Sequence, residues 1–176
     1  GIPAQQILDE GLLAGMNIVG VKFKNNEVFV PEVLVAARAM NQGAALLKPL
    51  LAQDGIKASG RVCIGTVQGD LHDIGKNLVV LMLKNYGFRV IDLGKDASKE
   101  RIIETALSEN AEIIGLSALM TTTMQQMKNV IDYAKQRNVA AKFMVGGAVI
   151  TQEYADEIGA DGYAKDASEA VKVCQK

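Results

Sequence analysis

Apolar positions recur at two different periods along the chain, which divides it into two parts. In the first part, residues 4–20 and 31–52 carry apolar side chains three and four positions apart, which predicts two amphipathic helices. Pro31 suits the first turn of the second helix, where its missing N–H breaks no hydrogen bond. We expect a loop or short extended stretch over 22–30 and a polar linker over 53–60.

In the second part, short β-branched or apolar runs alternate with helical stretches. The runs predict five strands, at 62–67, 89–93, 113–117, 143–145 and 162–164. The stretches after them predict helices at about 76–86, 98–109, 122–137, 152–158 and 167–175. Such alternation implies a parallel sheet with helices on both faces, and right-handed crossovers favour the strand order 2-1-3-4-5.

The predicted fold class is therefore α/β, with a flavodoxin-like or Rossmann-like, doubly wound, parallel five-stranded sheet preceded by an all-α region. Two helices alone bury little apolar surface. We expect the all-α region either to be part of a larger helical bundle or to rest on the sheet domain.

Composition narrows the possible functions. Apolar residues make up 49% of the chain and charged residues 22%, which is typical of a globular protein. The 19 basic and 20 acidic residues balance, whereas a nucleic-acid-binding face needs a basic excess. No apolar run approaches the roughly 20 residues that span a bilayer, and two cysteines make no disulfide framework. We expect a cytoplasmic protein that binds neither nucleic acid nor membrane.

Candidate chemistry gathers where such sheets bind ligands, at the carboxyl ends of the strands beside the reversal of strand order. His72 is the only histidine, and it lies in the loop after the first predicted strand. A lone histidine is more often an ordinary loop residue, but here Asp70 precedes it by two positions. A metal-ligating imidazole usually donates its other N–H to a carboxylate, which makes Asp70 the candidate carboxylate. Ser117, at the end of the third strand, is expected to hydrogen-bond Asp70 in turn.

One histidine does not complete a zinc site, which needs three or four protein ligands. A single axial ligand suits a metal already held by a macrocycle, either a haem or a corrin. Two readings stay open for the other residues of this edge. Gly69, Gly75, Gly146 and Gly147 either leave room for a large ligand or are turn glycines. The hydroxyl run at 121–123 either lines the site or caps a helix.

Other α/β sites lack their motifs. The chain has no G-x-G-x-x-G after its first strand, no P-loop and no G-x-S-x-G pentapeptide. A phosphoacceptor receiver domain would carry an aspartate where Ser117 stands.

Three short motifs resemble those of a known family. Asp70–Gly75 resembles the D-x-H-x-x-G signature of cobalamin-binding domains, Ser117–Leu119 the S-x-L motif, and Gly146–Gly147 the paired glycines. The first motif alone would be weak evidence. All three occur in order, separated by 41 residues (76–116) and 26 residues (120–145), as in that family.

The resemblance extends to the first part of the chain. Residues 15–20 and 29–34 resemble the helical cap of the small corrinoid proteins of methyltransferase systems. It implies a helical cap over residues 1–55 and a cobalamin-binding domain over 60–176. The family's cap is a four-helix bundle, so we expect this one to be a partial, N-terminally truncated bundle.

The resemblance also implies a cofactor and a site. Cobalamin, as methylcobalamin, or a related corrinoid would bind with its own lower base displaced, and His72 would ligate the cobalt. Asp70 and Ser117 would complete a hydrogen-bonded relay to His72, and the nucleotide tail would enter a slot beside the sheet. The implied cofactor-binding residues are Gly69, Asp70, Leu71, His72, Asp73, Ile74, Gly75, Ser117, Leu119, Thr121, Thr122, Gly146 and Gly147.

The implied function is to carry a methyl group on cobalt, with no catalysis by this chain alone. The expected partners are a methyl-donor-specific methyltransferase, an acceptor methyltransferase that uses tetrahydrofolate or a thiol, and a corrinoid reactivation protein. Two alternatives share the fold. A subunit of an adenosylcobalamin mutase would need a large catalytic barrel, and a corrinoid-sensing regulatory module would need an output domain; neither is found in the sequence.

Overall fold

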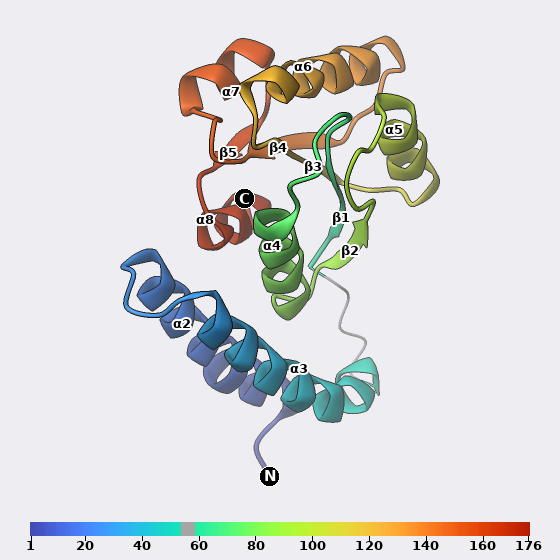
Figure 1. Cartoon of the computed structure of the whole chain (residues 1–176). Coiled ribbons are helices and arrows are strands. Elements are labelled where there is room, and N and C mark those ends of the chain that lie inside the picture. The colour runs from blue at the N-terminus through green and yellow to red at the C-terminus, as the bar shows by residue number, and fades with distance from the viewer. Residues whose placement is uncertain (54–58) are drawn as a thin grey trace. The chain divides into compact units, whose positions relative to one another are not determined.

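The computed structural model describes residues 1–53 and 59–176, which belong to two compact units, Gly1–Ala58 and Ser59–Lys176 (Figure 1). The sequence placed the corresponding boundaries at 1–55 and 60–176. Most of the expected linker at 53–60 lies outside the described residues.

The first unit consists of two helical runs. One comprises α1 (Ala4–Gln6), the π-helical segment η1 (Ile7–Leu13) and α2 (Ala14–Lys24), and the other is α3 (Val30–Gln53). The first run is thus longer than the predicted 4–20, and the connection expected over 22–30 shortens to five residues. Asn26 adopts a left-handed φ of 59° in this connection, which asparagine tolerates better than most residues.

One stripe of side chains holds the two helical runs together. Met16 of α2 is buried, as are Val33, Ala37 and Met40 of α3. The runs lie close together at Gly43, where a Cβ atom would be 2.9 Å from the side chain of Leu12. Other large apolar side chains of this unit stay exposed: Ile18, Val21, Phe29, Leu34, Val35 and Leu46. A helix pair has only one buried stripe, which is why the unit leaves so much apolar surface uncovered.

The second unit contains a parallel five-stranded sheet, as the sequence predicts. Its strands are β1 (Arg61–Thr66), β2 (Arg89–Asp92), β3 (Ile113–Ser117), β4 (Lys142–Gly146) and β5 (Gly162–Ala164). All neighbours pair in parallel in the order β2-β1-β3-β4-β5, so the predicted doubly wound fold is confirmed. Strand order therefore reverses between β1 and β3, the place where such sheets bind ligands.

Helices cover both faces of this sheet. They are α4 (Ile74–Asn85), α5 (Lys99–Ser108), α6 (Thr121–Gln136), α7 (Gln152–Ile158) and α8 (Ala167–Cys174). Figure 1 shows α4 beside α8 and, across the sheet, α6 beside α7. Helix α4 begins two residues before the predicted start, which places Gly75 inside its first turn instead of in a loop.

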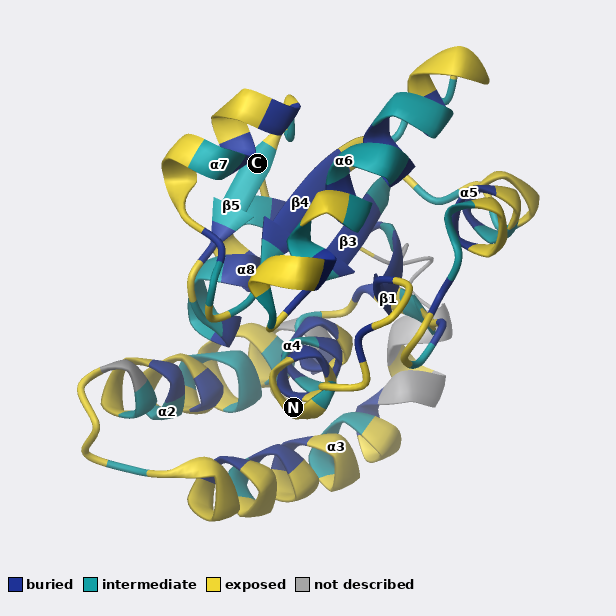
Figure 2. Cartoon of the chain, turned by 45° about the horizontal axis from the view of Figure 1, so that its top comes forward, coloured by how far each residue is buried: buried dark blue, intermediate teal, exposed yellow. Residues whose placement is uncertain are grey.

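The core lies between the central strands and the helices of one face. Buried apolar side chains of β3 and β4 pack against α5, α6 and α7, and these strands are dark blue in Figure 2. Strands buried on both faces read as continuous apolar runs, which explains why the sequence located them well. Among the helices that the structure describes, none is both long and apolar enough to cross a membrane.

The turn after β4 comes unusually close to the connection after β3. The N–H of Ala118 donates to the carbonyl oxygen of Gly146 (3.2 Å). A Cβ atom on Gly147 would lie 1.9 Å from the carbonyl oxygen of Ala118, and Gly147 has a φ of 133°. Backbone fills the space a side chain would need, so only glycine fits at position 147.

We expect Gly147→Ala to lower the free energy of unfolding by at least about 3 kcal/mol, because it adds a backbone clash to a strained φ. Urea denaturation of the unliganded chain measures the change. Gly75→Ala is the matched control: no atom lies within 4 Å of its Cβ position, and alanine favours a helix by up to about 1 kcal/mol. Equal stabilities of the two variants would contradict the packing at Gly147.

Candidate functional site

The sheet register aligns the ends of the strands that carry the predicted motifs. Thr66 at the end of β1 pairs with Ser117 of β3, and Ser117 pairs with Gly146 of β4. The three connections that follow these residues therefore leave the sheet from one edge. The structure brings together the loop with His72, the β3–α6 connection and the turn after β4, as the sequence predicts.

At the centre of this edge is Asp70, whose side chain is 0% exposed. Its Oδ2 accepts hydrogen bonds from the N–H of Leu119 (2.7 Å) and the hydroxyl of Thr123 (2.7 Å). Its Oδ1 accepts from the N–H of His72 (3.0 Å) and lies 2.8 Å from His72 Nδ1. A buried carboxylate is costly unless donors satisfy both of its oxygens, and here each oxygen has two partners.

These donors keep Asp70 ionised. Desolvation by burial acts to raise the pKa of Asp70, but the hydrogen bonds from Thr123, Leu119 and His72 together outweigh it. The net result is a pKa well below the ordinary 3.8 of an aspartate. Hydrogen bonds to the charged form stabilise that form, so the carboxylate stays negative at all ordinary pH values.

The imidazole of His72 is fixed on one side and free on the other. Because the ionised carboxylate of Asp70 can only accept, Nδ1 carries the proton of this contact, so in the neutral imidazole the lone pair is on Nε2. The His72 side chain is 50% exposed. An outward Nε2 on a ring whose tautomer is set by a carboxylate is the arrangement of a metal-ligating histidine.

One predicted contact is wrong. The hydroxyl that bonds Asp70 belongs to Thr123, not to Ser117, and none of the hydrogen bonds found among the described residues joins Ser117 to Asp70. Ser117 instead accepts the N–H of Val67 with its carbonyl oxygen (3.0 Å). It lies at the same edge, but the third member of the relay comes from the first turn of α6.

The interpretation that the hydroxyl side chains at 121–123 cap a helix is also wrong. The N-cap of α6 is Met120, which has no capping side chain, and Thr121 and Thr122 are exposed. A signal for Thr123 was present in the sequence. It lies four residues before Met127, on the apolar face of α6, where a buried hydroxyl needs a polar partner.

The sequence left two interpretations open for the glycines of this edge, as turn glycines or as room for a large ligand, and the structure favours a different one at different positions. Gly69 has a left-handed φ of 82° and is a turn glycine. The pair at 146 and 147 is also required by the protein's own packing, since Cβ atoms there would meet the carbonyl oxygens of Ala164 at 2.7 Å and Ala118 at 1.9 Å. Of these four glycines, only Gly75 has no heavy atom within 4 Å of its Cβ position, which suits a bulky ligand close to the first turn of α4.

Apolar side chains lie around the imidazole without being buried. Leu71, in the loop before His72, is 62% exposed, Ile74, the first residue of α4, is 77% exposed, and Leu119 is 40% exposed. Asp73, the N-cap residue of α4, makes no side-chain cap. Residues 1–53 and 59–176 bring together no three His, Cys, Asp or Glu side chains that could hold a metal ion by themselves. One nitrogen ligand amid exposed apolar groups fits a metal that arrives in a large, partly apolar macrocycle.

Comparison with known families agrees with this geometry. A B12 binding domain matches residues 60–172, and a second B12 binding domain matches residues 2–48. The chain belongs to the B12-binding corrinoid proteins. Its cofactor is thus a cobalamin or related corrinoid, and the predicted family is confirmed.

Curated relatives of this chain are themselves named as corrinoid proteins. It is 48% identical to dimethylamine corrinoid protein 3 of Methanosarcina acetivorans, over 97% of this chain and 81% of that protein. It is 43% identical to a corrinoid protein of Desulfitobacterium hafniense, over 96% and 81% of the two chains.

Solved structures show the same fold. A cobalamin-binding protein from Desulfitobacterium hafniense superposes with a TM-score of 0.86 and 32% identity, over 98% of this chain and 82% of that one. A chain of the methanol:cobalamin methyltransferase complex from Methanosarcina barkeri gives a TM-score of 0.79 and 31% identity, over 98% and 66%.

We expect Asp70→Asn to lower the free energy of unfolding by about 2–3 kcal/mol near pH 7, because an amide leaves one buried donor facing another. The folded pKa of Asp70 lies below the unfolded value, so its ionisation stabilises the fold above pH 3.8, and this contribution is lost as the pH falls further. Urea denaturation should show a constant difference between the two chains from about pH 7 to about pH 5, and a difference that narrows progressively as the pH falls below 3.8 toward about pH 2. Asp156→Asn on α7 is the exposed control. A pH-independent gap would contradict the assignment.

Thr123→Val and Ser117→Ala separate the two candidate relay hydroxyls. Loss of the Thr123 hydroxyl removes a hydrogen bond to the ionised form, so the pKa of Asp70 should rise toward its ordinary value. Ser117→Ala should leave it unchanged. The pH titration of the Asp70 carboxyl carbon by NMR measures both, and an effect of Ser117→Ala equal to that of Thr123→Val would show that the relay runs through Ser117.

Proposed function

We propose that this corrinoid protein carries a methyl group between two methyltransferases, with His72 as the lower ligand of the cobalt. The observation that supports this most directly is the contact of His72 Nδ1 with Asp70 on a half-exposed imidazole, which leaves Nε2 for a metal. When bound, the corrinoid supplies a cobalt centre that accepts and releases a methyl group.

The chain's own residues orient His72 as a ligand for the cobalt. Asp70 fixes the proton of His72 on Nδ1 and makes Nε2 more basic, and Leu119 and Thr123 keep that carboxylate ionised and immobile. The network is assembled from two connections of a rigid sheet, so the imidazole is oriented before a ligand binds. The exposed side chains of Leu71 and Ile74 would lose contact with water on binding a macrocycle, which favours the bound state.

The partners belong to the same proposal. Relatives are named for dimethylamine and monomethylamine, and one similar structure is a methanol:cobalamin methyltransferase complex. These names support a methyl donor with a C–N or C–O methyl group, held by a donor-specific methyltransferase. An acceptor methyltransferase using tetrahydrofolate or a thiol, a corrinoid reactivation protein and a cytoplasmic location complete the proposal.

The ligand assignment can be tested cleanly because the chain has only one histidine. We expect the chain, loaded with cobalamin and reduced to Co(II), to show nitrogen superhyperfine splitting in its EPR spectrum. Growth on ¹⁵N-histidine labels no imidazole except that of His72, and should convert each triplet into a doublet. His72→Ala should abolish the protein-derived splitting, whereas Asp156→Asn, at an exposed position on α7, keeps it.

A splitting that ¹⁵N-histidine leaves unchanged would mean that the cofactor's own base stays on the cobalt, which contradicts the proposal.

Methyl carriage is tested with the same variants. Isotopically labelled dimethylamine and a dimethylamine methyltransferase should transfer label to the loaded chain, and His72→Ala should slow this transfer at least about tenfold, the equivalent of about 1.4 kcal/mol in the barrier.

A further inference from the structure

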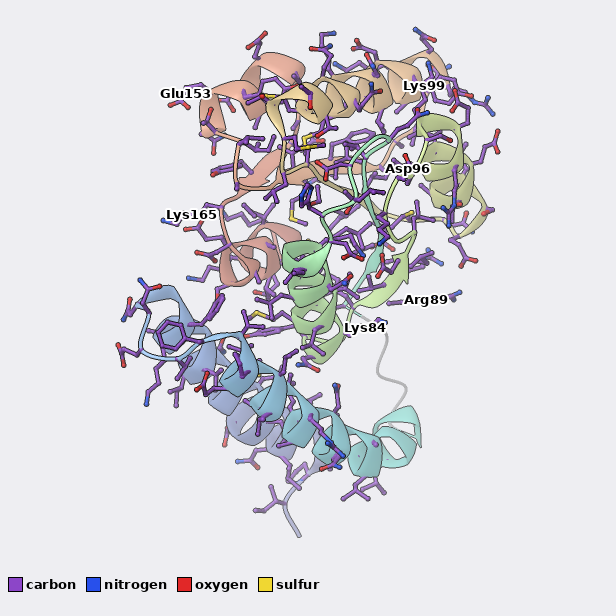
Figure 3. All side chains as sticks on the ribbon, viewed as in Figure 1. Lys84, Arg89, Asp96, Lys99, Glu153 and Lys165 are labelled. Carbon is purple, nitrogen blue, oxygen red and sulfur yellow. The ribbon has the colours of Figure 1, made fainter. Side chains whose placement is uncertain are left out.

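The loop that carries His72 is held by hydrogen bonds from a second connection, which belongs to none of the three motifs. We call residues 69–73 the histidine loop and residues 93–98, between β2 and α5, the clamp connection. Asp96 lies in the clamp connection and is labelled in Figure 3. Its Oδ1 accepts the N–H of Gly69 (2.7 Å), and its own N–H donates to the carbonyl oxygen of Asp70 (3.1 Å). One residue thus binds two consecutive residues of the histidine loop.

The backbone conformation around Asp96 allows both hydrogen bonds to form. Asp96 has a left-handed φ of 54°, a conformation that aspartate tolerates better than most residues. The N–H of Thr66 donates to the carbonyl oxygen of Gly94 and the N–H of Ala97 to that of Thr66, both at 2.9 Å. Val67 and Ala97 form a parallel bridge. The clamp connection therefore runs alongside the end of β1, with contacts on both sides of Asp96 in the chain.

The far side of the histidine loop is anchored to the same region. Lys76, in the first turn of α4, has a fully buried side chain, and its Nζ lies 2.5 Å from Oδ1 of Asp92. Asp92 is the last residue of β2 and also accepts the N–H of Gly94 (2.9 Å). The histidine loop is thus held from before Asp70 by Asp96 and from after His72 by the Lys76–Asp92 pair.

The contacts with Asp96 matter because two different parts of the chain form hydrogen bonds to Asp70. Its carboxylate accepts hydrogen bonds from Leu119 in the β3–α6 connection and from Thr123 in the first turn of α6. Its carbonyl oxygen accepts the N–H of Asp96 in the clamp connection. If the backbone at Gly69 and Asp70 moved, the carboxylate could not keep both its partners on α6 and its bond to His72. Catalytic and ligand groups lose function when they shift by as little as about 1 Å.

We propose that Asp96 is a positioning residue for His72: through its bonds to Gly69 and Asp70 it fixes the histidine loop so that Asp70 holds the imidazole with Nε2 outward. This inference rests on the proposed function for its purpose, since an oriented Nε2 is what a cobalt ligand requires. Its geometric content concerns the chain alone and is testable without cofactor.

The test uses two substitutions at Asp96. Asp96→Gly removes the carboxylate but keeps the left-handed backbone accessible, whereas Asp96→Asn keeps an acceptor oxygen for Gly69 and should behave like the original chain. Lys95→Gly, next along the clamp connection, is the matched control because it adds the same backbone freedom without removing the acceptor. Circular dichroism checks that each variant is folded.

In the unliganded chain, the ¹⁵N shifts of the single histidine report which ring nitrogen carries the proton. We expect the original chain, Asp96→Asn and Lys95→Gly to hold the proton on Nδ1, and Asp96→Gly to show a mixture of tautomers. Amide exchange at Gly69 should become at least about tenfold faster in Asp96→Gly, as expected on loss of a hydrogen bond to a charged acceptor. An unchanged tautomer and unchanged Gly69 exchange would overturn the positioning role.

The cofactor arm distinguishes the two proposals. With Co(II) cobalamin and ¹⁵N-histidine, Asp96→Gly should bind corrinoid with a smaller histidine-ligated fraction than Asp96→Asn or Lys95→Gly. If the original chain itself shows no splitting from histidine, the proposed function fails, while the tautomer and exchange results still decide whether Asp96 positions His72. If histidine ligation is present and equal in all variants, the positioning role fails and the proposed function stands.

Discussion

Everything at the ligand-binding edge depends on one buried carboxylate. Asp70 is excluded from water, and its two oxygens are satisfied by the histidine loop on one side and by the β3–α6 connection on the other. A charge in such a place is stable only while its donors stay in position. The network therefore makes the orientation of His72 and the packing of two separate connections a single, cooperative arrangement.

The sheet supplies the rigidity that this arrangement needs. Parallel register places Thr66, Ser117 and Gly146 in one row, so the connections that follow them begin side by side. Close approach then completes the edge, because the backbone of Ala118 occupies the space where a side chain on Gly147 would stand. The paired glycines of the family motif thus have a role in joining two connections, whatever contact they also make with a corrinoid.

Local sequence signals were strong where burial dictates residue type. Strands buried on both faces read as apolar runs, and the strand order followed from the handedness of crossovers. The motif around His72 indicated both the candidate ligand and the carboxylate that contacts it, because the two residues are only two positions apart. Helix ends were less well located: α4 begins at Ile74 and α2 continues to Lys24, since tertiary packing extends helices past their strongest periodic positions.

The sequence by itself determined the fold class, the edge that binds ligands, and the Asp70–His72 pair. Only the tertiary structure decided which groups complete that pair. Thr123 lies 53 positions from Asp70, and Asp96 lies 27 positions from Gly69. A hydroxyl or carboxylate at such separations has no fixed direction along the chain. Its partner is set by how connections from different strands meet at the sheet edge, which is why Thr123, one turn into α6, replaced Ser117 as the hydroxyl that holds the carboxylate.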